Sequence, residues 1–488
     1  MDWTNVATIA YLLSWVIFLV ALYIIPRNRK PGEATAWLMV IFALPYLGFI
    51  LFLIFGSPKL SKNRRAMQHT MSTKIGAAGA RFQQQPELHA LLNPPISERY
   101  APFIQLSQNL GGMPAFGGNS VELLADYMGA VERIVAEIDG AQSYVHLEYF
   151  MFADDSTGSQ MIDAVIRAQE RGVKCRVLWD HLSNTNFRKP AIERLTAAKV
   201  EVHEVLPVKI FDQEWSRLDL RNHRKITVVD GQVGFTGSQN IIDRNYHKKG
   251  NIQKGLYYIE LVARVSGPVV GQLDAAFRTD WYSETQEELS RETYPALEFK
   301  PVKTGDVLCQ VLPSGPGFDA DNNARLFTAL FYGAQRKLTI ANPYFVPDEA
   351  LMTAITSAAQ RGVDVTLIVS EIGDQFMVFH AQRSFYEELM QAGVKIYRYK
   401  SPVLLHSKHF SVDDDIAVIG SSNMDIRSFE LNLEVTLVCY DKGVVADMQA
   451  VFEDYLRHST LLNSGEWATR PMSVKFFDNL MRLTSSLQ

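Results

Sequence analysis

His223-Arg224-Lys225-Ile226-Thr227-Val228-Val229-Asp230 leads, after a short gap, to Gly237-Ser238-Gln239-Asn240. The same arrangement returns later in the chain, where His406-Ser407-Lys408-His409-Phe410-Ser411-Val412-Asp413 leads to Gly420-Ser421-Ser422-Asn423. In both copies the lysine follows the histidine by two residues, the aspartate by seven and the glycine by fourteen. Identical spacing in two copies predicts an internal repeat.

The sequence around the two motifs repeats as well. In each copy a Gly-Ala-Gln tripeptide precedes a strand-like run that ends in Tyr-Phe, and a helical stretch then ends in Arg-Gly-Val before another strand. The matching pieces are 140–142 and 333–335, Tyr149-Phe150 and Tyr344-Phe345, 171–173 and 361–363, and the strands 174–179 and 364–369, followed by 200–205 and 394–399. Alternating strands and helices predict an α/β fold whose sheet is covered on both faces.

The strand period assigns the motif side chains to faces. His223 and Lys225 share one face of a strand, as do His406 and Lys408, because side chains alternate along a strand. Asp230 and Asp413 are an odd number of residues from the histidines, so their side chains would lie on the opposite face of the strand. Asp230-Gly231 is a strong hairpin-turn signal, so we expect Asp230 and Asp413 to fix turns and nearby charges rather than to transfer protons.

Two sets of histidine, lysine, serine and asparagine suit phosphodiester chemistry. Two ammonium groups stabilise the charge of a pentacoordinate phosphorus, while one imidazole attacks and the other protonates the leaving oxygen. The symmetry of the motifs leaves open which histidine attacks. A solvated strand face is the plain alternative for either motif alone, and two identical copies disfavour it. A metal site is also disfavoured, because no ligand cluster accompanies the histidines and two lysines repel a cation.

The first 60 residues are apolar. Residues 6–25 and 34–55 are each long enough to cross a membrane as a helix, so we expect two spans. A signal peptide is the competing interpretation, but no basic residue precedes the first stretch. Two spans would place the rest of the chain on the same side of the membrane as the N-terminus. Basic residues of the short connection and of the segment after residue 58 are nearly balanced, so they favour a cytoplasmic catalytic domain only marginally.

Length and composition limit the class of protein. The chain has 488 residues, of which 47% are hydrophobic and 21% charged, and its net charge is −5. At roughly 150 residues per domain this length allows about three units. The composition excludes a disordered chain and argues against a dedicated nucleic-acid binder. Cys175, Cys309 and Cys439 form no CxxC pair, so we expect buried thiols rather than disulfides or zinc ligands.

The expected organisation has four parts. Residues 1–60 form the membrane segment, and 61–118 form a polar, largely irregular linker and entry segment in which 76–79 and 83–86 read as flexible. Residues 119–300 are the first repeat. The second repeat, 301–488, ends in an amphipathic helix over 475–483 that either rests on the membrane or packs on the domain.

The pattern His-x-Lys-x4-Asp, present twice, resembles that of the phospholipase D superfamily. Within this superfamily the chain is similar over its whole length to the bacterial cardiolipin synthases of the phospholipase D type, through the two spans, the two motifs, the run 342–347 and the segment 405–434. The resemblance implies two tandem α/β/α sandwich repeats related by a pseudo-twofold axis, with one active site between them.

The resemblance also implies roles for single residues. His223 would be the nucleophile and His406 the general acid and base. Phosphate would be held by Lys225, Lys408, Asn240 and Asn423, and the loops shaped by Ser238 and Ser421, with Asp230 and Asp413 completing the catalytic motifs. Glu434 and, with less agreement to the family pattern, Glu260 would orient the histidines. A surface strand charge is the plain alternative for Glu434.

The implied reaction is phosphatidyl transfer between two phosphatidylglycerol molecules through a phosphohistidine, giving cardiolipin and glycerol without cofactor or metal. Phospholipase D hydrolysis and phosphatidylserine synthesis share the first half-reaction, so the residues leave the acceptor open. A membrane-attached nuclease and a non-catalytic lipid-binding scaffold are further alternatives. We expect phosphatidylglycerol and cardiolipin in the bacterial inner membrane as partners, and no nucleic acid; oligomerisation does not follow from the sequence. The loops 183–222 and 243–254 are candidate walls for the second lipid.

Overall fold

Both repeats of the chain contribute to one continuous sheet in the computed structural model, which describes residues 3–27, 29–56, 59–86, 88, 91, 94–208, 217, 219–290, 294, 297 and 300–484. The strands of the first repeat are β1 (Phe116–Leu124), β2 (Tyr144–Tyr149), β3 (Lys174–Asp180), β4 (Glu201–Val205), β5 (Arg221–Asn222), β6 (Lys225–Val229), β7 (Val233–Gly237), β8 (Tyr257–Ile259) and β9 (Val262–Ser266). Those of the second are β10 (Val307–Ser314), β11 (Lys337–Ala341), β12 (Phe345–Val346), β13 (Asp364–Ser370), β14 (Lys395–Tyr399), β15 (Val403–Leu405), β16 (His409–Val412), β17 (Ile416–Gly420), β18 (Met424–Asp425), β19 (Asn432–Tyr440) and β20 (Ser459–Leu461).

The strand order shows the twofold relation of the repeats. From one edge the sheet runs β4-β3-β2-β6-β7-β9-β1, and it continues through β10-β19-β17-β16-β11-β13-β14 to β20 at the other edge. The second series is the first in reverse, strand for strand, with β1 and β10 as the antiparallel pair at the centre. The expected tandem repeat with pseudo-twofold symmetry is therefore confirmed.

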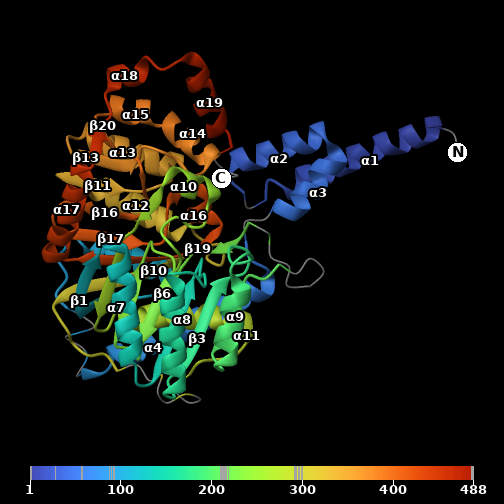
Figure 1. Ribbon diagram of the computed structural model, residues 1–488. Helices are drawn as coiled ribbons and strands as arrows, with labels where there is room; N and C mark the ends of the chain where they lie inside the picture. The colour runs from blue at the N-terminus through green and yellow to red at the C-terminus, as the bar shows by residue number, and fades with distance from the viewer. Residues whose placement is uncertain are drawn as a thin grey trace.

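Helices cover both faces of this sheet (Figure 1). The segment before the first repeat contributes α4 (Lys62–Gln83) and α6 (Ala101–Gly111), and the first repeat contributes α7 (Tyr127–Gly140), α8 (Gly158–Glu170), α9 (Arg188–Ala197), α10 (Lys249–Lys254) and α11 (Val270–Thr285). In the second they are α12 (Asn322–Gly333), α13 (Glu349–Gln360), α14 (Phe376–Ser384), α15 (Tyr386–Gln391), α16 (Ile426–Glu430), α17 (Lys442–Arg457), α18 (Ser464–Ala468) and α19 (Met472–Arg482). One buried cluster joins α11 and α17 across both repeats, while each repeat has its own core on the other face. Burial of one continuous apolar surface thus holds the two halves together.

Two expectations about the soluble part are wrong. The segment 61–118 contains α4 and α6 and the start of β1, so residues 76–79 lie inside a helix rather than in a flexible linker. The match of Tyr149-Phe150 to Tyr344-Phe345 is displaced by two residues. Phe152 bridges to Ile241, and its counterpart Phe345 pairs with Met424, which places Phe152 and Phe345 at equivalent positions. The three cysteines are buried and unbridged, as expected.

The apolar N-terminal part forms three helices, not two. They are α1 (Trp3–Ile24), α2 (Pro31–Ala43) and α3 (Pro45–Phe55). Residues 6–24 are the one candidate membrane-spanning helix in the part of the chain that the structure describes. The expected continuous helix from 34 to 55 is interrupted at Leu44, because Pro45 disfavours the helical conformation at the residue before it.

The ends of α2 and α3 both lie against the catalytic domain. Lys30, just before α2, is paired with Glu430 at 2.5 Å, and the carbonyl oxygen of Phe55, at the end of α3, accepts a hydrogen bond from Arg217. The hydroxyl group of Tyr46, beside the interruption, donates to the carbonyl oxygen of Ala10 in α1. Figure 1 shows α2 leading away from the domain, α3 leading back, and α1 extending further to the N-terminus.

The motif aspartates act as clamps at the start of β2 and β11. Asp230 accepts hydrogen bonds from the backbone amides of residues 142–144, at 2.7–2.9 Å, and Asp413 accepts from those of residues 335–337, at 2.7–3.2 Å. Both aspartates have a positive φ of 53°, which the hairpin turn requires. Burial acts to raise the pKa of Asp413, but the three amides and Arg99 outweigh it and lower the pKa. The recurring Gly-Ala-Gln tripeptide is thus one partner of a repeated tertiary contact.

Replacing Asp413 with alanine should destabilise the fold, because three backbone amides and Arg99 lose their acceptor. We expect a loss of about 2–3 kcal/mol of unfolding free energy, measured by denaturant unfolding of the full chain in detergent. Asp414→Ala is the matched control, since this neighbouring carboxylate is 63% exposed and pairs only with the equally exposed Arg336. Equal stabilities of the two variants would show that the clamp contributes nothing.

Candidate active site

The two motif histidines are buried, and each is bonded to a carboxylate of the other repeat. Nδ1 of His223 lies 3.0 Å from both carboxylate oxygens of Glu434. Nδ1 of His406 lies 2.6 Å from Oε1 of Glu260. Both carboxylates are fully buried, so the plain alternative of a surface strand charge for Glu434 is wrong. The crossed pairs bring the two motifs into one site.

Short bridging strands make this crossing possible. β5, just before His223, pairs in parallel with the start of β19, and β15, just before His406, pairs in parallel with β8. The amide of His223 donates to the carbonyl oxygen of Leu433 at 2.9 Å, and the amide of His406 donates to that of Ile259 at 2.9 Å. Each histidine is therefore fixed, through its own backbone, beside the residue that precedes its carboxylate partner.

Each lysine contacts the backbone of its own motif histidine. The expectation that histidine and lysine share one face of a strand is wrong, because β6 begins at Lys225 and β16 at His409, so that His223, His406 and Lys408 lie in the connections before these strands. Nζ of Lys225 donates to the carbonyl oxygen of His223 at 2.6 Å, and Nζ of Lys408 donates to that of His406 at 2.5 Å. Both side chains are buried. Burial lowers the pKa of Lys225 to about 7 and that of Lys408 to about 8, although the two glutamates oppose the shift. An anion bound between them would favour their charged forms.

The motif serines support the strands that carry the glutamates. The hydroxyl oxygen of Ser238 accepts from the amide of Leu261 at 3.0 Å, and that of Ser421 accepts from the amide of Val435 at 3.0 Å. Ser421 also donates to Glu434 at 2.5 Å. The serines thus fix the residues that follow Glu260 and Glu434, which agrees with a shaping role.

The motif asparagines differ in their contacts. The side-chain amide of Asn240 accepts from the backbone amide of Met151 and donates to the hydroxyl group of Tyr246, both at 3.2 Å. By contrast, Oδ1 of Asn423 is buried and has no hydrogen-bond partner among the described residues. Only the second asparagine therefore has a side-chain oxygen left for another group.

Burial controls the protonation of the histidines. It lowers the pKa of His223 to about 4 and also lowers that of His406, while the paired carboxylates oppose both shifts. For Glu434 and Glu260 burial acts to raise the pKa, but the histidines outweigh it and the pKa values lie below the ordinary range. Because each Nδ1 faces a carboxylate, Nε2 of each imidazole is the nitrogen available for chemistry.

The surroundings of the two histidines are not symmetric. The ring of Phe150 meets His223 edge-on at 4.8 Å between centroids. Three tyrosine rings surround His406 edge-on at 5.2–5.8 Å, namely those of Tyr246, Tyr258 and Tyr344. Sequence reasoning did not identify these aromatic residues, although Tyr246 lies in the loop 243–254 that it singled out.

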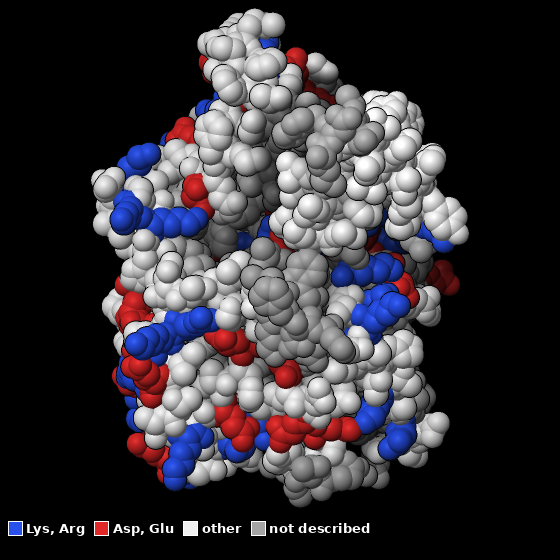
Figure 2. All heavy atoms as spheres, turned by 90° about the vertical axis from the view of Figure 1, so that its right-hand side faces the viewer, with Lys and Arg blue, Asp and Glu red and all other residues white. Residues whose placement is uncertain are grey.

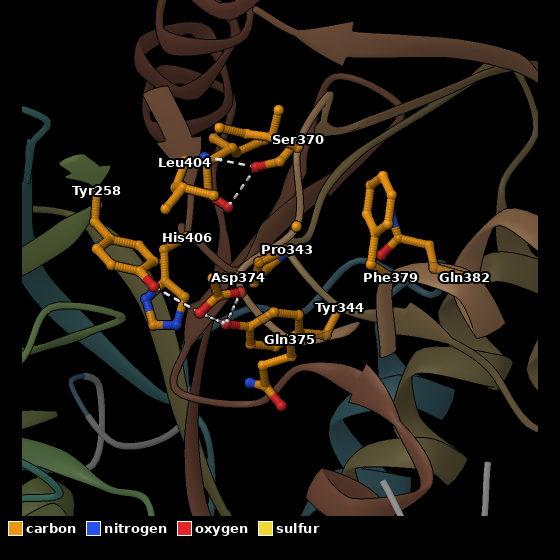
Figure 3. Close-up of a pocket in the computed structure, with 13 residues that line it drawn as sticks. Tyr258, Pro343, Tyr344, Ser370, Asp374, Gln375, Phe379, Gln382, Leu404 and His406 are labelled. Carbon is orange, nitrogen blue, oxygen red and sulfur yellow. Dashed lines mark hydrogen bonds between the residues drawn. The ribbon is translucent and has the colours of Figure 1, made fainter. Parts of the chain in front are cut away.

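A pocket opens beside His406 and contains a further carboxylate (Figure 3). Asp374 accepts from the hydroxyl group of Tyr258 at 2.5 Å and from that of Tyr344 at 2.9 Å, and it pairs with Lys248. Its charge acts to raise the pKa of His406, against the larger effect of burial. No motif contains Asp374, so sequence reasoning had no signal for it. It reaches the site because the loop after β13 lies against β8.

A second layer of charges lies beneath His223. Arg224 donates to the backbone oxygen of Glu434 at 3.1 Å and pairs with Asp280. Asn222 donates to Glu148 at 2.5 Å, and burial raises the pKa of Glu148 well above its ordinary range. These contacts fix the residues on both sides of the histidine. The expected loop 183–222 is wrong for the part that contains α9, β4 and β5, and 209–216 and 218 lie outside the described residues.

The motif aspartates do not belong to the site. Asp230 and Asp413 lie beyond the far ends of β6 and β16, where backbone amides use their carboxylates, so their inclusion among the catalytic residues has no geometric support. One group of described residues has the spacing of metal ligands, Asp155, Asp243 and His247. Hydrogen bonds from Ser156, Thr157 and Gly158 already engage its carboxylates, and it contains neither motif histidine.

Comparison with known families gives two matches. The family described as "Cardiolipin synthase, PLD-like domain" matches residues 134–281 and 327–456, one copy on each repeat. The family described as "Phospholipase_D-nuclease N-terminal" matches residues 10–57, which contain α2, α3 and the part of α1 from residue 10 onward.

Curated relatives resemble the chain over nearly its whole length. Cardiolipin synthase A of Pectobacterium carotovorum subsp. carotovorum is 34% identical over 96% of this chain and 95% of the relative. Cardiolipin synthase A of Edwardsiella ictaluri is 33% identical over 99% of both chains. Among solved structures, phosphatidylserine synthase of Haemophilus influenzae superposes with a TM-score of 0.60 and 17% identity, covering 79% of this chain and all of that chain. At this identity the structural match shows a shared fold.

The lowered lysine pKa values predict that anion binding weakens with rising pH. Both lysines are charged below about pH 7 and lose their protons as the pH rises through about 7 to 8. Sulfate is a suitable probe because its charge is constant over this range. Its affinity, measured by calorimetry on the full chain, should fall about tenfold between pH 6 and 9, which corresponds to about 1.4 kcal/mol.

Two variants locate this effect. Lys225→Gln should weaken sulfate binding at pH 6 and leave only the decline that belongs to Lys408, near pH 8. Lys249→Gln changes an exposed lysine outside the site and should leave the curve as it is. A sulfate affinity that stays constant from pH 6 to 9 would contradict the assignment.

Proposed function

The chain belongs to the cardiolipin synthase family of phospholipase D-like proteins, and on this premise we propose that it joins two phosphatidylglycerol molecules into cardiolipin with release of glycerol. The observation that carries the proposal is the pair of buried imidazoles, each held at Nδ1 by a carboxylate of the other repeat and each next to a lysine. Two imidazoles and two ammonium groups suit a double displacement at phosphorus.

In the first half-reaction the phosphate of one phosphatidylglycerol lies between the histidines. Nε2 of His223 attacks phosphorus, and the bond between phosphorus and the glycerol oxygen breaks. His406 gives its proton to that oxygen, so glycerol leaves and a phosphatidyl-histidine remains. Lys225, Lys408 and Asn423 hold the nonbridging oxygens, and Asn240 positions the loop through Tyr246.

In the second half-reaction a hydroxyl group of another phosphatidylglycerol attacks phosphorus. His406, now neutral, takes the proton of this hydroxyl, and the bond between phosphorus and His223 breaks. Cardiolipin leaves and both histidines return to their starting states. The number of phosphodiester bonds is unchanged, so the exchange requires no nucleotide.

The different surroundings of the histidines support this division of roles. A nucleophile must be neutral, and burial with Lys225 nearby lowers the pKa of His223 to about 4. A general acid must carry a proton. Burial lowers the pKa of His406 as well, but two carboxylates, Glu260 and Asp374, oppose this shift, whereas Glu434 alone does so at His223. The sequence motifs are symmetric and give no such distinction.

A different acceptor is the alternative. Water in place of the second lipid would make the protein a phospholipase D, and serine would make it a phosphatidylserine synthase, which is the activity named for the structural neighbour. Two observations favour a lipid acceptor: the curated relatives named cardiolipin synthase and the apolar helix α1, which is long enough to cross a membrane.

For the membrane part we propose that α1 crosses the inner membrane while α2 and α3 enter and leave it on the side of the catalytic domain. The 13 residues of α2 and the 11 of α3 span about 20 Å and 17 Å, less than the roughly 30 Å of hydrocarbon. Both outer ends contact the catalytic domain, and the turn between them is hydrogen-bonded to α1. Such a re-entrant segment is tolerated where protein satisfies its backbone.

This arrangement places the N-terminus opposite the catalytic domain, unlike the two-span expectation. It also changes the charge count. The basic residues near the membrane, Arg27, Arg29, Lys30, Lys59, Lys62, Arg64 and Arg65, all fall on the side of the catalytic domain. The positive-inside rule then supports a cytoplasmic catalytic domain clearly instead of marginally.

The acceptor is tested with purified protein in vesicles that contain phosphatidylglycerol alone. Lipid mass spectrometry should find cardiolipin with an equal amount of glycerol. His223→Ala should lose this activity by at least about 10³-fold, because the covalent step is removed. Phosphatidic acid without cardiolipin would mean that water is the acceptor, and the absence of any product would contradict the proposal.

The topology is tested with single cysteines and a membrane-impermeant maleimide in vesicles of known orientation. Asp2→Cys marks the N-terminus and Leu461→Cys marks an exposed position of the catalytic domain; the native cysteines are buried. We expect the two positions to react from opposite sides of the membrane. Reaction of both from the same side would favour two complete crossings.

A further inference from the structure

The C-terminal helix α19 is fixed to α14 through one buried carboxylate. Asp478 of α19 accepts from Nδ1 of His380 in α14 at 2.7 Å and from Arg470 at 2.5 Å, and it lies 3.5 Å from Arg383. Asp478 is only 1% exposed. The helix is therefore held in a defined orientation, with this face turned inward.

The opposite face of α19 exposes apolar side chains. Met472, Phe476 and Leu480 follow at intervals of four residues and form one stripe, with Phe477 and Leu483 beside it. Phe476 is 63% exposed and Leu483 is 80% exposed. The first residues of α14 add Phe376, which is 66% exposed, and Met377. We refer to these seven residues as the α14–α19 face, and an apolar group of this kind marks an interaction surface.

The position of this face indicates a bilayer as its partner. α19 lies on the side of the domain from which α1 projects, and it runs across the direction of α1, as a helix in the plane of the membrane surface does (Figure 1). Figure 2 shows this side of the molecule, where charged side chains gather on the lower half and are sparse on much of the upper half.

Basic residues border the face. Lys475 and Arg482 lie on α19 itself, and Lys249 and Lys254 lie on α10 together with Ile252, which is 55% exposed. Aromatic and aliphatic side chains bordered by lysine and arginine suit the headgroup region of an anionic membrane. A second copy of the chain would require no such basic border.

The face is continuous with the pocket beside His406. α14 begins two residues after Asp374, and Phe379 of α14 lines the pocket together with Tyr344 and His406 (Figure 3). α10 joins the same rim through the pairing of Lys248 with Asp374. A bilayer that contacts α14 and α19 would therefore have its headgroups at the mouth of this pocket.

We propose that the α14–α19 face inserts into the headgroup region of an anionic phospholipid bilayer and holds the His406 pocket against the membrane surface. The proposal rests on the membrane anchoring proposed for α1, and it goes beyond that anchoring because it fixes the orientation of the catalytic domain. A lipid acceptor then reaches His406 without leaving the bilayer.

Spin labels on introduced cysteines test the proposal in the full chain, reconstituted in vesicles of phosphatidylglycerol and phosphatidylethanolamine. A nitroxide at Phe476→Cys should collide more with oxygen than with a water-soluble nickel chelate, as expected for shallow insertion. Leu461→Cys, 51% exposed on β20, is the matched control and should report water. A nitroxide at Leu12→Cys in α1 should report the hydrocarbon core of the bilayer. This position checks the membrane anchoring of α1 independently of the α14–α19 face.

Three results would overturn the proposal. Position 476 could be as accessible to the nickel chelate as position 461 while position 12 reports hydrocarbon, which would leave the anchoring intact. Positions 12 and 476 could both report water, which would remove the anchoring as well. Position 476 could be shielded from both reagents and show spin–spin coupling between two labels, which would identify a second copy of the chain as the partner of the α14–α19 face.

An activity measurement separates docking from chemistry. Phe476→Glu with Phe477→Glu should lower turnover on vesicle phosphatidylglycerol by about tenfold, because charged side chains oppose insertion, and should change turnover on short-chain monomeric phosphatidylglycerol less than about twofold. Leu461→Glu should change neither. An equal loss on both substrates would indicate damage to the fold, and no loss on vesicles would contradict docking.

Discussion

The crossed bond between a histidine of one repeat and a glutamate of the other is the interaction on which the site depends. His223 with Glu434 and His406 with Glu260 are fully enclosed, so a carboxylate without its partner would be a buried, uncompensated charge. The bridging strands, the β1–β10 seam and the shared core of α11 and α17 all serve to keep the four residues in register. Neither repeat alone can form a working site, because each crossed pair takes one residue from each repeat.

Symmetry sets the positions of the paired motif residues, and departures from symmetry give them different surroundings. The paired lysines, serines and glutamates are nearly equivalent in the two repeats. The differences lie in residues outside the motifs, with Phe150 beside His223 and three tyrosines and Asp374 beside His406. A duplicated framework thus places the paired groups twice, while unduplicated loops give the two imidazoles different surroundings.

The sequence predicted the fold well where the information was local. Hydrophobic period, turn signals and equal spacing placed β6, β7, β16 and β17 and the hairpins between them. Strand parity did not describe the His-x-Lys segments, because His223, His406 and Lys408 lie outside these strands. The sequence did not predict which glutamate serves which histidine, because strand parity says nothing about partners 211 or 146 residues apart. The second membrane stretch was misjudged because hydropathy does not register a helix interruption at a single proline. Asp374 was missed since no repeat marks it.

The crossed pairs also determine when the site can form during translation of the chain. Glu434 follows His223 by 211 residues, which is roughly ten to forty seconds of translation. During that interval the first repeat contains His223 and Glu260 without their partners from the second repeat. The site is completed only when nearly the whole chain has left the ribosome. A chain that ends before Glu434 therefore lacks the partner of His223, and one that ends before His406 has neither crossed pair.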